Sequence, residues 1–323
     1  MPFRLWLRKG FYFWGVDKMR IGIIGAGNVG SAVGVLLQAK GHEIIGIASR
    51  SSKSANQLAK RLGIKVLRQE KIARIADVVL LTVNDGAIAD VATKLSYLMA
   101  FHPGQVVVHF SGSLPAGILA PVRNCGAFAV SIHPLQSCAG IEVAINNLPR
   151  SVFSIEGDNE AFSVAEKLIS DLEGKHFYIN GKDKMLYHAA AVFISNYAVT
   201  LADISRRMLE RLNVPTDIGM EGMLTLLKGT VANIDAFGAP GALTGPIARG
   251  DSEVVRQHLQ QIALNMPELT QVYTEMAKHT VEVALAKGSI SGEQADELSK
   301  VVKGDLGRGN YHENYRNAEL CVV

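Results

Sequence analysis

The segment Arg20-Ile-Gly-Ile-Ile-Gly25-Ala-Gly27-Asn-Val-Gly30 decides the fold. It starts with a short apolar run, which is typical of a strand buried on both faces. The run ends in the pattern G-x-G-x-x-G and is followed by a helical pattern over 31–40. A glycine motif between a strand and a helix is typical of a dinucleotide-binding turn. The sequence therefore predicts a nucleotide-binding α/β domain that begins near Met19.

Each glycine of the motif has its own physical task. Gly25 permits the tight turn, Gly27 lets the main chain approach a pyrophosphate, and Gly30 lets helix and strand pack closely. The free N–H groups and the positive dipole end of the helix then favour phosphate oxygens. Glycines that serve only the turn would give the same pattern. The predicted pyrophosphate contacts are Gly25, Ala26, Gly27, Asn28, Val29 and Gly30.

The rest of the chain changes character once. Strands are predicted at 20–25, 42–49, 64–67, 77–83, 105–110, 127–132, 152–156 and 176–179, with helices at 31–40, 54–62 and 159–172. This alternation indicates a parallel, doubly wound sheet. From 182 onward, only helices are predicted, at 183–212, 216–236, 251–287 and 291–302. The predicted fold class is α/β, a doubly wound Rossmann sheet followed by an all-α C-terminal domain.

Composition and charge divide the chain into four predicted parts. They are an extension or mis-assigned start (1–18), a Rossmann domain (19–181), a helical domain for substrate and dimerisation (182–305) and a tail (306–323). Residues 1–18 hold both tryptophans and account for the net charge of +3. An upstream start codon explains this segment, and a short amphipathic surface anchor is the alternative. The balanced remainder predicts no basic face for nucleic acid.

Other sequence features bear on the cellular setting. No apolar run reaches the ~18 uninterrupted residues of a membrane span. Cys125, Cys138 and Cys321 show no metal or redox spacing. Free thiols suit a reducing compartment, so we expect a cytoplasmic protein without a membrane partner or a metal.

The end of the second predicted strand distinguishes NAD from NADP. An NAD site usually has a carboxylate there, about 20 residues after the glycines, for the ribose 2′-hydroxyl. This chain instead has Ser49-Arg50-Ser51. An arginine can bind a 2′-phosphate with two N–H groups, and serine hydroxyls can add hydrogen bonds. We therefore predict NADP(H), with a solvated loop arginine as the alternative reading of Arg50.

Two further strand ends border the expected cofactor crevice. Val83 and Asn84 follow the strand at 77–83, and Ser111 follows the strand at 105–110. Ligands of such sheets bind at the carboxyl ends of the strands. These residues are therefore predicted near the nicotinamide. For the neighbouring Asp85, an N-cap of the next helix is the favoured reading.

Polar residues also gather where a substrate would lie. His133 precedes a proline, which restricts its backbone to extended conformations, and Gln136 and Ser137 follow it. His133 is predicted to hold substrate or donate a proton, with a structural hydrogen bond that closes the sheet end as the alternative. On the helix at 183–212, Lys184, His188 and Ser195 fall within roughly 40° at about 100° per residue. Asn196 lies beside that stripe.

Because a buried polar stripe costs free energy unless it is paired, this helix is predicted to face a cleft. A third polar cluster surrounds the Gly245-Pro246 turn. Thr244 and Arg249 are predicted there as substrate contacts, since arginine binds carboxylate or phosphate with two N–H groups. An Arg249–Asp251 bridge that locks the turn is the alternative, and Asp251 is predicted to cap the next helix.

The chain resembles bacterial proteins that join a Rossmann-like domain to a helical domain of unknown function, DUF2520. The matching stretches are the glycine motif, 107–112, 131–137, 186–196 and 242–251. These proteins are similar in architecture to pyrroline-5-carboxylate reductase, 6-phosphogluconate dehydrogenase and ketopantoate reductase. The resemblance implies a 6-phosphogluconate-dehydrogenase-like helical domain and an NADP oxidoreductase. Related dehydrogenases place an asparagine four residues after a catalytic lysine, whereas Lys184 is followed at that distance by His188.

The leading interpretation is an NADP(H)-dependent oxidoreductase. It would transfer hydride to or from a small, anionic carbonyl or imine substrate, such as a ketopantoate-like oxo-acid. His188 or Lys184 is the expected general acid. A homodimer through the helical domain is expected. The alternative function is an NADP(H)-binding sensor or scaffold without turnover, and a deazaflavin coenzyme is a further possibility from some relatives.

Overall fold

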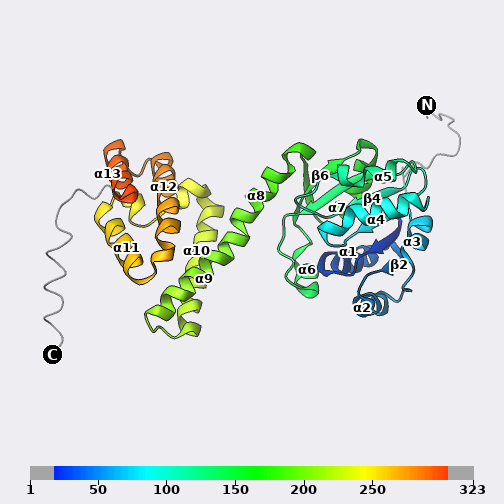
Figure 1. The fold of residues 1–323 in the computed structure, drawn as a ribbon, viewed down its shortest axis with the longest axis horizontal. Coiled ribbons are helices and arrows are strands. Elements are labelled where there is room, and N and C mark those ends of the chain that lie inside the picture. Colours follow the sequence, from blue (N-terminus) through cyan, green and yellow to red (C-terminus); the bar gives the residue numbers. More distant parts are fainter. Residues whose placement is uncertain (1–17, 305–323) are drawn as a thin grey trace. The chain divides into compact units, whose positions relative to one another are not determined.

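The computed structural model describes residues 18–304 (Figure 1). The chain divides into two compact units, Met1–Ala198 and Val199–Val323. The predictions for residues 1–17 and for the tail lie outside the described residues. Each unit is described by itself below.

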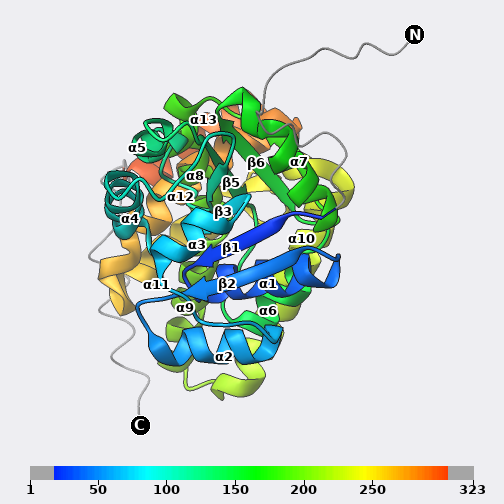
Figure 2. The ribbon, with the colours of Figure 1, turned by 90° about the vertical axis from the view of Figure 1, so that its right-hand side faces the viewer.

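The first unit contains a seven-stranded sheet in the order β2-β1-β3-β4-β5-β6-β7 (Figure 2). Neighbouring strands are parallel except for β5 and β6, which are antiparallel. The predicted fold class, a doubly wound Rossmann sheet followed by helices, is confirmed. The strands are β1 (Arg20–Ile24), β2 (Glu43–Ala48), β3 (Val78–Leu81), β4 (Val106–His109), β5 (Phe128–Pro134), β6 (Val152–Gly157) and β7 (Lys175–Tyr178).

Helices cover both faces of this sheet. Successive strand residues point to opposite faces, so Ile23 and Leu80 belong to one core while Ile24 and Leu81 belong to the other. The helices are α1 (Asn28–Ala39), α2 (Ser52–Leu62), α3 (Gln69–Ile75), α4 (Asp85–Tyr97), α5 (Ala120–Arg123), α6 (Ile141–Asn147), α7 (Phe162–Asp171) and α8 (Lys184–Ile194). Short 3₁₀ turns are η1 (Ala116–Leu119), η2 (Asn159–Ala161) and η3 (Gly181–Asp183).

The two cores divide these helices between the faces. The first core takes side chains from α1, α2 and α7, together with Ala144 of α6. The second core takes side chains from α3, α4 and α5. This arrangement leaves the carboxyl ends of β1 to β5 together at one edge of the sheet, where the site is built.

Two local predictions for this unit need correction. The strand predicted at 64–67 is only a single bridge, in which Val66 pairs with Ile47. The five residues between Gly63 and the start of α3 do not form a longer strand pairing, and α3 itself was not predicted. The sheet is also not fully parallel, because only residues 135–151 connect β5 to β6 and the chain returns antiparallel.

Helices make up the second unit. They are α9 (Asn196–Arg211), which begins in the first unit, α10 (Thr216–Ala242), α11 (Ser252–Asn265), α12 (Thr270–Lys287) and α13 (Gly292–Lys303), with 3₁₀ turns η4 (Ile247–Arg249) and η5 (Pro267–Leu269). Val255, Val281 and Leu298 lie at the centre of its core. This core joins α11, α12 and α13 around buried aliphatic side chains.

Three predicted helices are interrupted. The helix at 183–212 breaks at Ser195, whose φ of −108° and ψ of −68° depart from helical values. The helix at 251–287 breaks at Met266, because Pro267 restricts the residue before it. The helix that starts at Thr216 runs beyond 236 but is interrupted by Gly238, with φ at 72°.

One helical stretch in the described residues, 181–211, is long and apolar enough to cross a membrane by length and composition. We expected its Ala-Ala-Ala-Val-Phe-Ile segment to be buried, but Phe193 and Ile194 are 69% and 76% exposed. Its first turn, by contrast, carries Lys184, which is fully buried in the first unit. The stretch is therefore anchored at one end by a polar contact inside the protein.

Candidate functional site

The glycine loop, residues 25–30, connects β1 to α1 with very little free space. Gly25 has φ at +122°, and a Cβ there would lie 2.3 Å from the Thr82 carbonyl oxygen. A Cβ on Gly30 would lie 2.2 Å from Thr82 Oγ1. A Cβ on Gly27 would meet nothing within 4 Å. Two glycines are therefore required by packing, whereas the third leaves main chain open to an incoming group.

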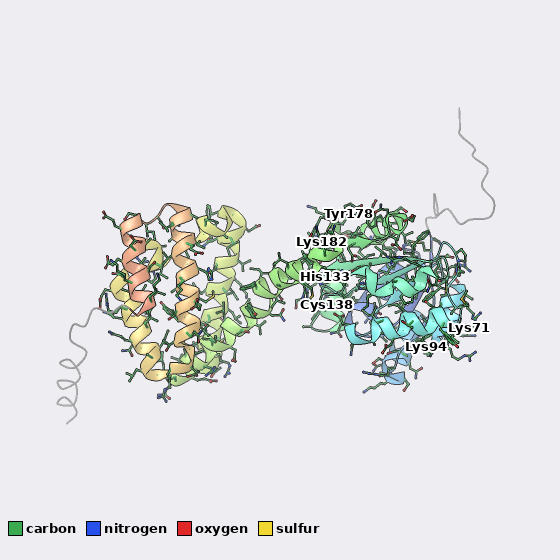
Figure 3. The ribbon with its side chains drawn as sticks, turned by 45° about the horizontal axis from the view of Figure 1, so that its top comes forward. Lys71, Lys94, His133, Cys138, Tyr178 and Lys182 are labelled. Carbon is green, nitrogen blue, oxygen red and sulfur yellow. The ribbon has the colours of Figure 1, made fainter. Side chains whose placement is uncertain are left out.

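The first turn of α1 is free for an anion. Gly27 is its N-cap and offers no side-chain cap, and the first turn contains no acidic residue. The unpaired N–H groups and the helix dipole favour negative charge at this point. The Asn28 side chain turns away and donates from Nδ2 to the Cys138 carbonyl, 2.8 Å away. The loop after β5, which Figure 3 labels at Cys138, is thereby tied to the glycine loop.

The end of β2 carries a cation without a partner. Arg50 is exposed and forms no ion pair within the described part of the chain, 18–304. Ser49 is half-buried, and Ser51 caps α2 by accepting a hydrogen bond from the Ser54 N–H at 3.2 Å. A cavity of 330 Å³ adjoins this segment, lined by Ala26, Ser31, Ser54, Gln57, Leu58, Arg61 and Ile141.

The rim beyond β3 and β4 is held by one carboxylate. Asp85 Oδ2 accepts hydrogen bonds from Ser111 Oγ at 2.6 Å and from Ser113 Oγ at 3.1 Å. The favoured reading of Asp85 as an N-cap is wrong, because Asn84 occupies that position. Asn84 is exposed and Val83 is half-buried. The carboxylate therefore fixes the loop that carries Ser111.

A row of polar residues crosses the sheet in register. His109 of β4 pairs with Ser131 of β5, which pairs with Glu156 of β6. All three lie under 9% exposed. The His109 Nδ1 accepts from the Ser111 N–H at 3.2 Å. Burial, reinforced by the charge of Lys184, lowers the pKa of His109 to about 3, so the ring is neutral near pH 7.

Lys184 completes this buried group, which we call the lysine cluster (Lys184, His109, Ser131 and Glu156). Its side chain is 0% exposed and donates from Nζ to Ser131 Oγ. Glu156 Oε2 lies 3.8 Å from the same Nζ. Burial lowers the pKa of Lys184 to about 8, against the opposing charges of Glu156 and Asp85. The side chain is therefore largely an ammonium near pH 7.

His133 and His188 lie next to each other above this cluster, and we call them the histidine pair. Their ring centroids are 6.1 Å apart. The Nδ1 of His133 shares a hydrogen bond of 2.8 Å with the Tyr187 hydroxyl. A Cβ on Gly112 would lie 2.6 Å from His133 Nε2 and 2.6 Å from His188 Cδ2. Gly112 therefore allows the two rings to meet over the loop after β4.

Charge and burial keep one of these rings neutral. Burial lowers the pKa of His133 to about 4, with further contributions from Lys184 and His188. The first unit brings together residues from three separate predictions. They are His133, Ser111, and the pair Lys184 and His188 from one helix. They offer a set of proton donors and acceptors beside the carboxyl ends of the strands.

The remaining predicted residues of this unit have other surroundings. Gln136 Nε2 donates to the Asn147 carbonyl at 3.2 Å and to Ser151 Oγ at 3.3 Å, while its Oε1 accepts from the Ser137 N–H. These bonds hold the loop after β5. Ser195 and Asn196 are exposed at the break between α8 and α9. We therefore do not count these two residues with the histidine pair.

Thr244 and Arg249 belong to the second unit. Thr244 lines a cavity of 280 Å³ with His258 and Tyr273. Arg249 is exposed and forms no bridge to Asp251 in the described structure, so that alternative is wrong. Asp251 instead caps α11 by accepting from the Val254 N–H at 3.2 Å, as predicted.

Sequence reasoning did not identify His109, Glu156 or the role of Tyr187. The available signal was a polar residue inside an otherwise apolar strand, which needs a buried partner. That rule would have identified His109 and Glu156 as members of a site without naming their partner. Among residues 18–304, no group of three or more His, Cys, Asp or Glu is arranged to hold a metal ion.

Comparisons of sequence agree with this architecture. A model of a Rossmann-like domain matches residues 15–134, and a model of the domain of unknown function DUF2520 matches residues 151–280. No curated protein matches the chain.

Solved structures extend the comparison. A protein from Thermotoga maritima is 30% identical, with a TM-score of 0.67, and the match covers 83% of this chain and 99% of that one. A Bacteroides fragilis protein named "putative NADP oxidoreductase" is 22% identical, with a TM-score of 0.67, covering 83% and 100%. Plasmodium falciparum pyrroline carboxylate reductase, solved with NADP bound, is 14% identical, with a TM-score of 0.53, covering 89% and 100%. The matches to the Bacteroides fragilis and Plasmodium falciparum proteins show similarity of fold alone.

Proposed function

The chain belongs to the family that joins a Rossmann-like domain to DUF2520, and from this premise we propose an NADP(H)-dependent oxidoreductase. Its substrate would be a small, anionic carbonyl or imine compound, such as an oxo-acid. The observation that carries the proposal is the geometry of the glycine loop. Gly25 and Gly30 pack against Thr82, while Gly27 faces open space at an uncapped helix N-terminus.

NADP(H) is favoured over NAD(H) by the end of β2. Within the described residues Arg50 lacks an anionic partner, and no carboxylate follows Ala48 in the way that a ribose 2′-hydroxyl would require. The neighbouring Ser51 and Ser54 add hydroxyl groups. A 2′-phosphate would supply the missing negative charge, since guanidinium groups bind phosphate with two hydrogen bonds.

The cofactor would supply hydride, and the chain's own residues would handle the proton. Reduction of a carbonyl or imine carbon leaves negative charge on the attached oxygen or nitrogen, which must take up one proton. We assign that donation to His188, because its ring is partly exposed. Lys184 was the other predicted donor, but its side chain is 0% exposed and donates a hydrogen bond to Ser131. We therefore assign it the role of a fixed positive charge near the histidine pair.

The rest of the site would hold the substrate. His133, neutral near pH 7, can donate or accept one hydrogen bond beside His188. Ser137 would add a hydroxyl contact. In the second unit, taken by itself, Arg249 stays our proposed contact for an anionic group, because it is exposed and has no ion-pair partner among the described residues, with Thr244 as a proposed hydroxyl contact.

We also propose that the protein works as a cytoplasmic homodimer, without nucleic acid or membrane partners. Along α10, Leu226 is 68% exposed, Val231 58% and Phe237 69%, so this helix lacks an apolar cover. A second copy would provide one. Sedimentation equilibrium tests this, and a monomer at all concentrations contradicts it.

The function is tested in two steps. Calorimetric titration with NADPH and NADH measures binding, and we expect NADPH to bind more tightly. NADPH absorbance is then followed with a panel of oxo-acids and cyclic imines. Turnover of one compound, lost in His188→Gln with coenzyme binding intact, supports the proposal. Tight coenzyme binding without turnover of any panel compound favours a sensor, and absence of coenzyme binding excludes both.

A further inference from the structure

Among residues 18–304, the buried ammonium of Lys184 has a single carboxylate within 4 Å. Its Nζ lies 3.8 Å from Glu156 Oε2, and both side chains are 10% exposed or less. An unpaired ammonium in such a place would give up its proton, because burial penalises the charged form. The identity of the partner therefore decides the charge of the lysine.

Glu156 is fixed from two sides. Its Oε2 accepts a hydrogen bond of 2.7 Å from the Ala116 N–H at the start of η1. On the other side lies Gly181, where a Cβ would come within 2.7 Å of Glu156 Oε1. Gly181 begins η3, the turn that leads directly into α8 and Lys184. The carboxylate thus fills a space that any larger residue at 181 would occupy.

We propose that Glu156 is a positioning residue that holds Lys184 as an ammonium behind the histidine pair, and that residue 181 is glycine to leave room for the carboxylate. The inference rests on the proposed function only for its effect on catalysis. The charge of Lys184 is a property of the folded chain alone.

The neighbouring charges show what this ammonium does. From α4, Asp85 acts with Glu156 to raise the pKa of Lys184, opposing the larger effect of burial. On β4 and β5, His109 and His133 each have a lowered pKa, to which burial contributes most and Lys184 next. Burial therefore keeps the His133 ring neutral near pH 7, and the charge of Lys184, which Glu156 supports, adds to that effect.

The test is a titration of single side chains by NMR in the full chain, without coenzyme. Lysine labelled with ¹³C at Cε reports Lys184, assigned by its loss in Lys184→Met, and ring C–H signals report His133. The parent should show a Lys184 midpoint near pH 8 and a His133 midpoint near pH 4. In Glu156→Gln the Lys184 midpoint should fall by about 1 to 3 pH units, whereas that of His133 should not rise, because Lys184 is still an ammonium near pH 4.

Two further variants separate charge from shape. The amide oxygen of Glu156→Gln can still accept from the Ala116 N–H, so the fold is expected to persist. Gly181→Ala keeps the carboxylate but displaces it, and should lower the Lys184 midpoint by less. Glu160→Gln, on the exposed start of η2, is the matched control and should not move it.

An unchanged Lys184 midpoint in folded Glu156→Gln overturns the inference. If Glu156→Gln does not fold, an unchanged Lys184 midpoint in Gly181→Ala overturns the inference instead. Because no coenzyme or substrate is present, failure of the oxidoreductase proposal leaves these titrations unaffected. Loss of the lysine's charge would in turn leave NADPH binding at the glycine loop unchanged.

Discussion

The glycine loop and the lysine cluster lie in the same unit but are made of different materials. The loop uses main chain and space, with Gly25 and Gly30 packed on Thr82 and Gly27 open. The cluster uses buried side chains from β4, β5, β6 and α8, which are distant in sequence. The loop contains no titratable side chain, whereas the properties of the cluster depend on the protonation states of its side chains. Their responses to substitution and to pH should therefore differ.

The largest effect is expected at the histidine pair. His188→Gln should lower turnover by about 10²- to 10⁴-fold, the usual contribution of a positioned proton donor. Coenzyme affinity should stay within twofold of the parent, on the order of experimental scatter. Stopped-flow measurement of NADPH oxidation and calorimetric titration check the two halves. Retained turnover in a folded variant would remove His188 from the mechanism.

The loop is tested by a matched pair of substitutions. Gly25→Ala places a Cβ against the Thr82 carbonyl at positive φ, and should reduce the free energy of unfolding by about 3 kcal/mol. Gly27→Ala places its Cβ in open space, so stability should change by less than ~0.5 kcal/mol. Its coenzyme affinity should nevertheless fall, because the methyl group blocks the approach of a pyrophosphate. Urea unfolding and calorimetry check this pair; equal stabilities would contradict it.

The 2′-phosphate contact should give an intermediate effect. Arg50→Asp removes hydrogen bonds to a charged group, so NADPH affinity should fall by about 10- to 100-fold. NADH affinity should stay level or rise. Lys60→Gln, an exposed cation further along α2, serves as the control. An unchanged ratio of NADPH to NADH affinity in Arg50→Asp would exclude this arginine from coenzyme choice.

The smallest effect is a pH dependence confined to the cluster. The pKa of His109 is about 3 when folded and 6.5 as the ordinary value. The unfolded chain therefore binds more protons between these values, and stability falls as the pH drops below 6.5. One pH unit below 6.5, we expect a loss of about 1 kcal/mol from this ring. Urea midpoints of His109→Gln should show a flatter profile, whereas exposed His279→Gln should follow the parent.

The same contrast explains what the sequence could predict. The glycine motif lies within six consecutive positions, so the sequence predicted the turn, although Thr82, against which two of the glycines pack, is distant in sequence. The lysine cluster depends on strand register, and the pairing of Ser131 with Glu156 exists only because β6 runs antiparallel. The local sequence marks Glu156 only as a polar residue in an apolar strand, and nothing nearby identifies Lys184 as its partner. The two helix breaks show the same contrast. Pro267 is a local signal for the break at Met266, whereas no neighbouring residue signals the break at Ser195.

The antiparallel pairing of β5 with β6 has a consequence for dissecting the chain. The Rossmann-like match ends at 134 and the DUF2520 match starts at 151, so the border between the two sequence families passes between neighbouring strands of one sheet. A fragment cut at that border would present β5, with Val130 and Ile132 now almost fully buried, as a bare edge open to self-association. The inherited modules of this protein are thus not its cooperative folding units.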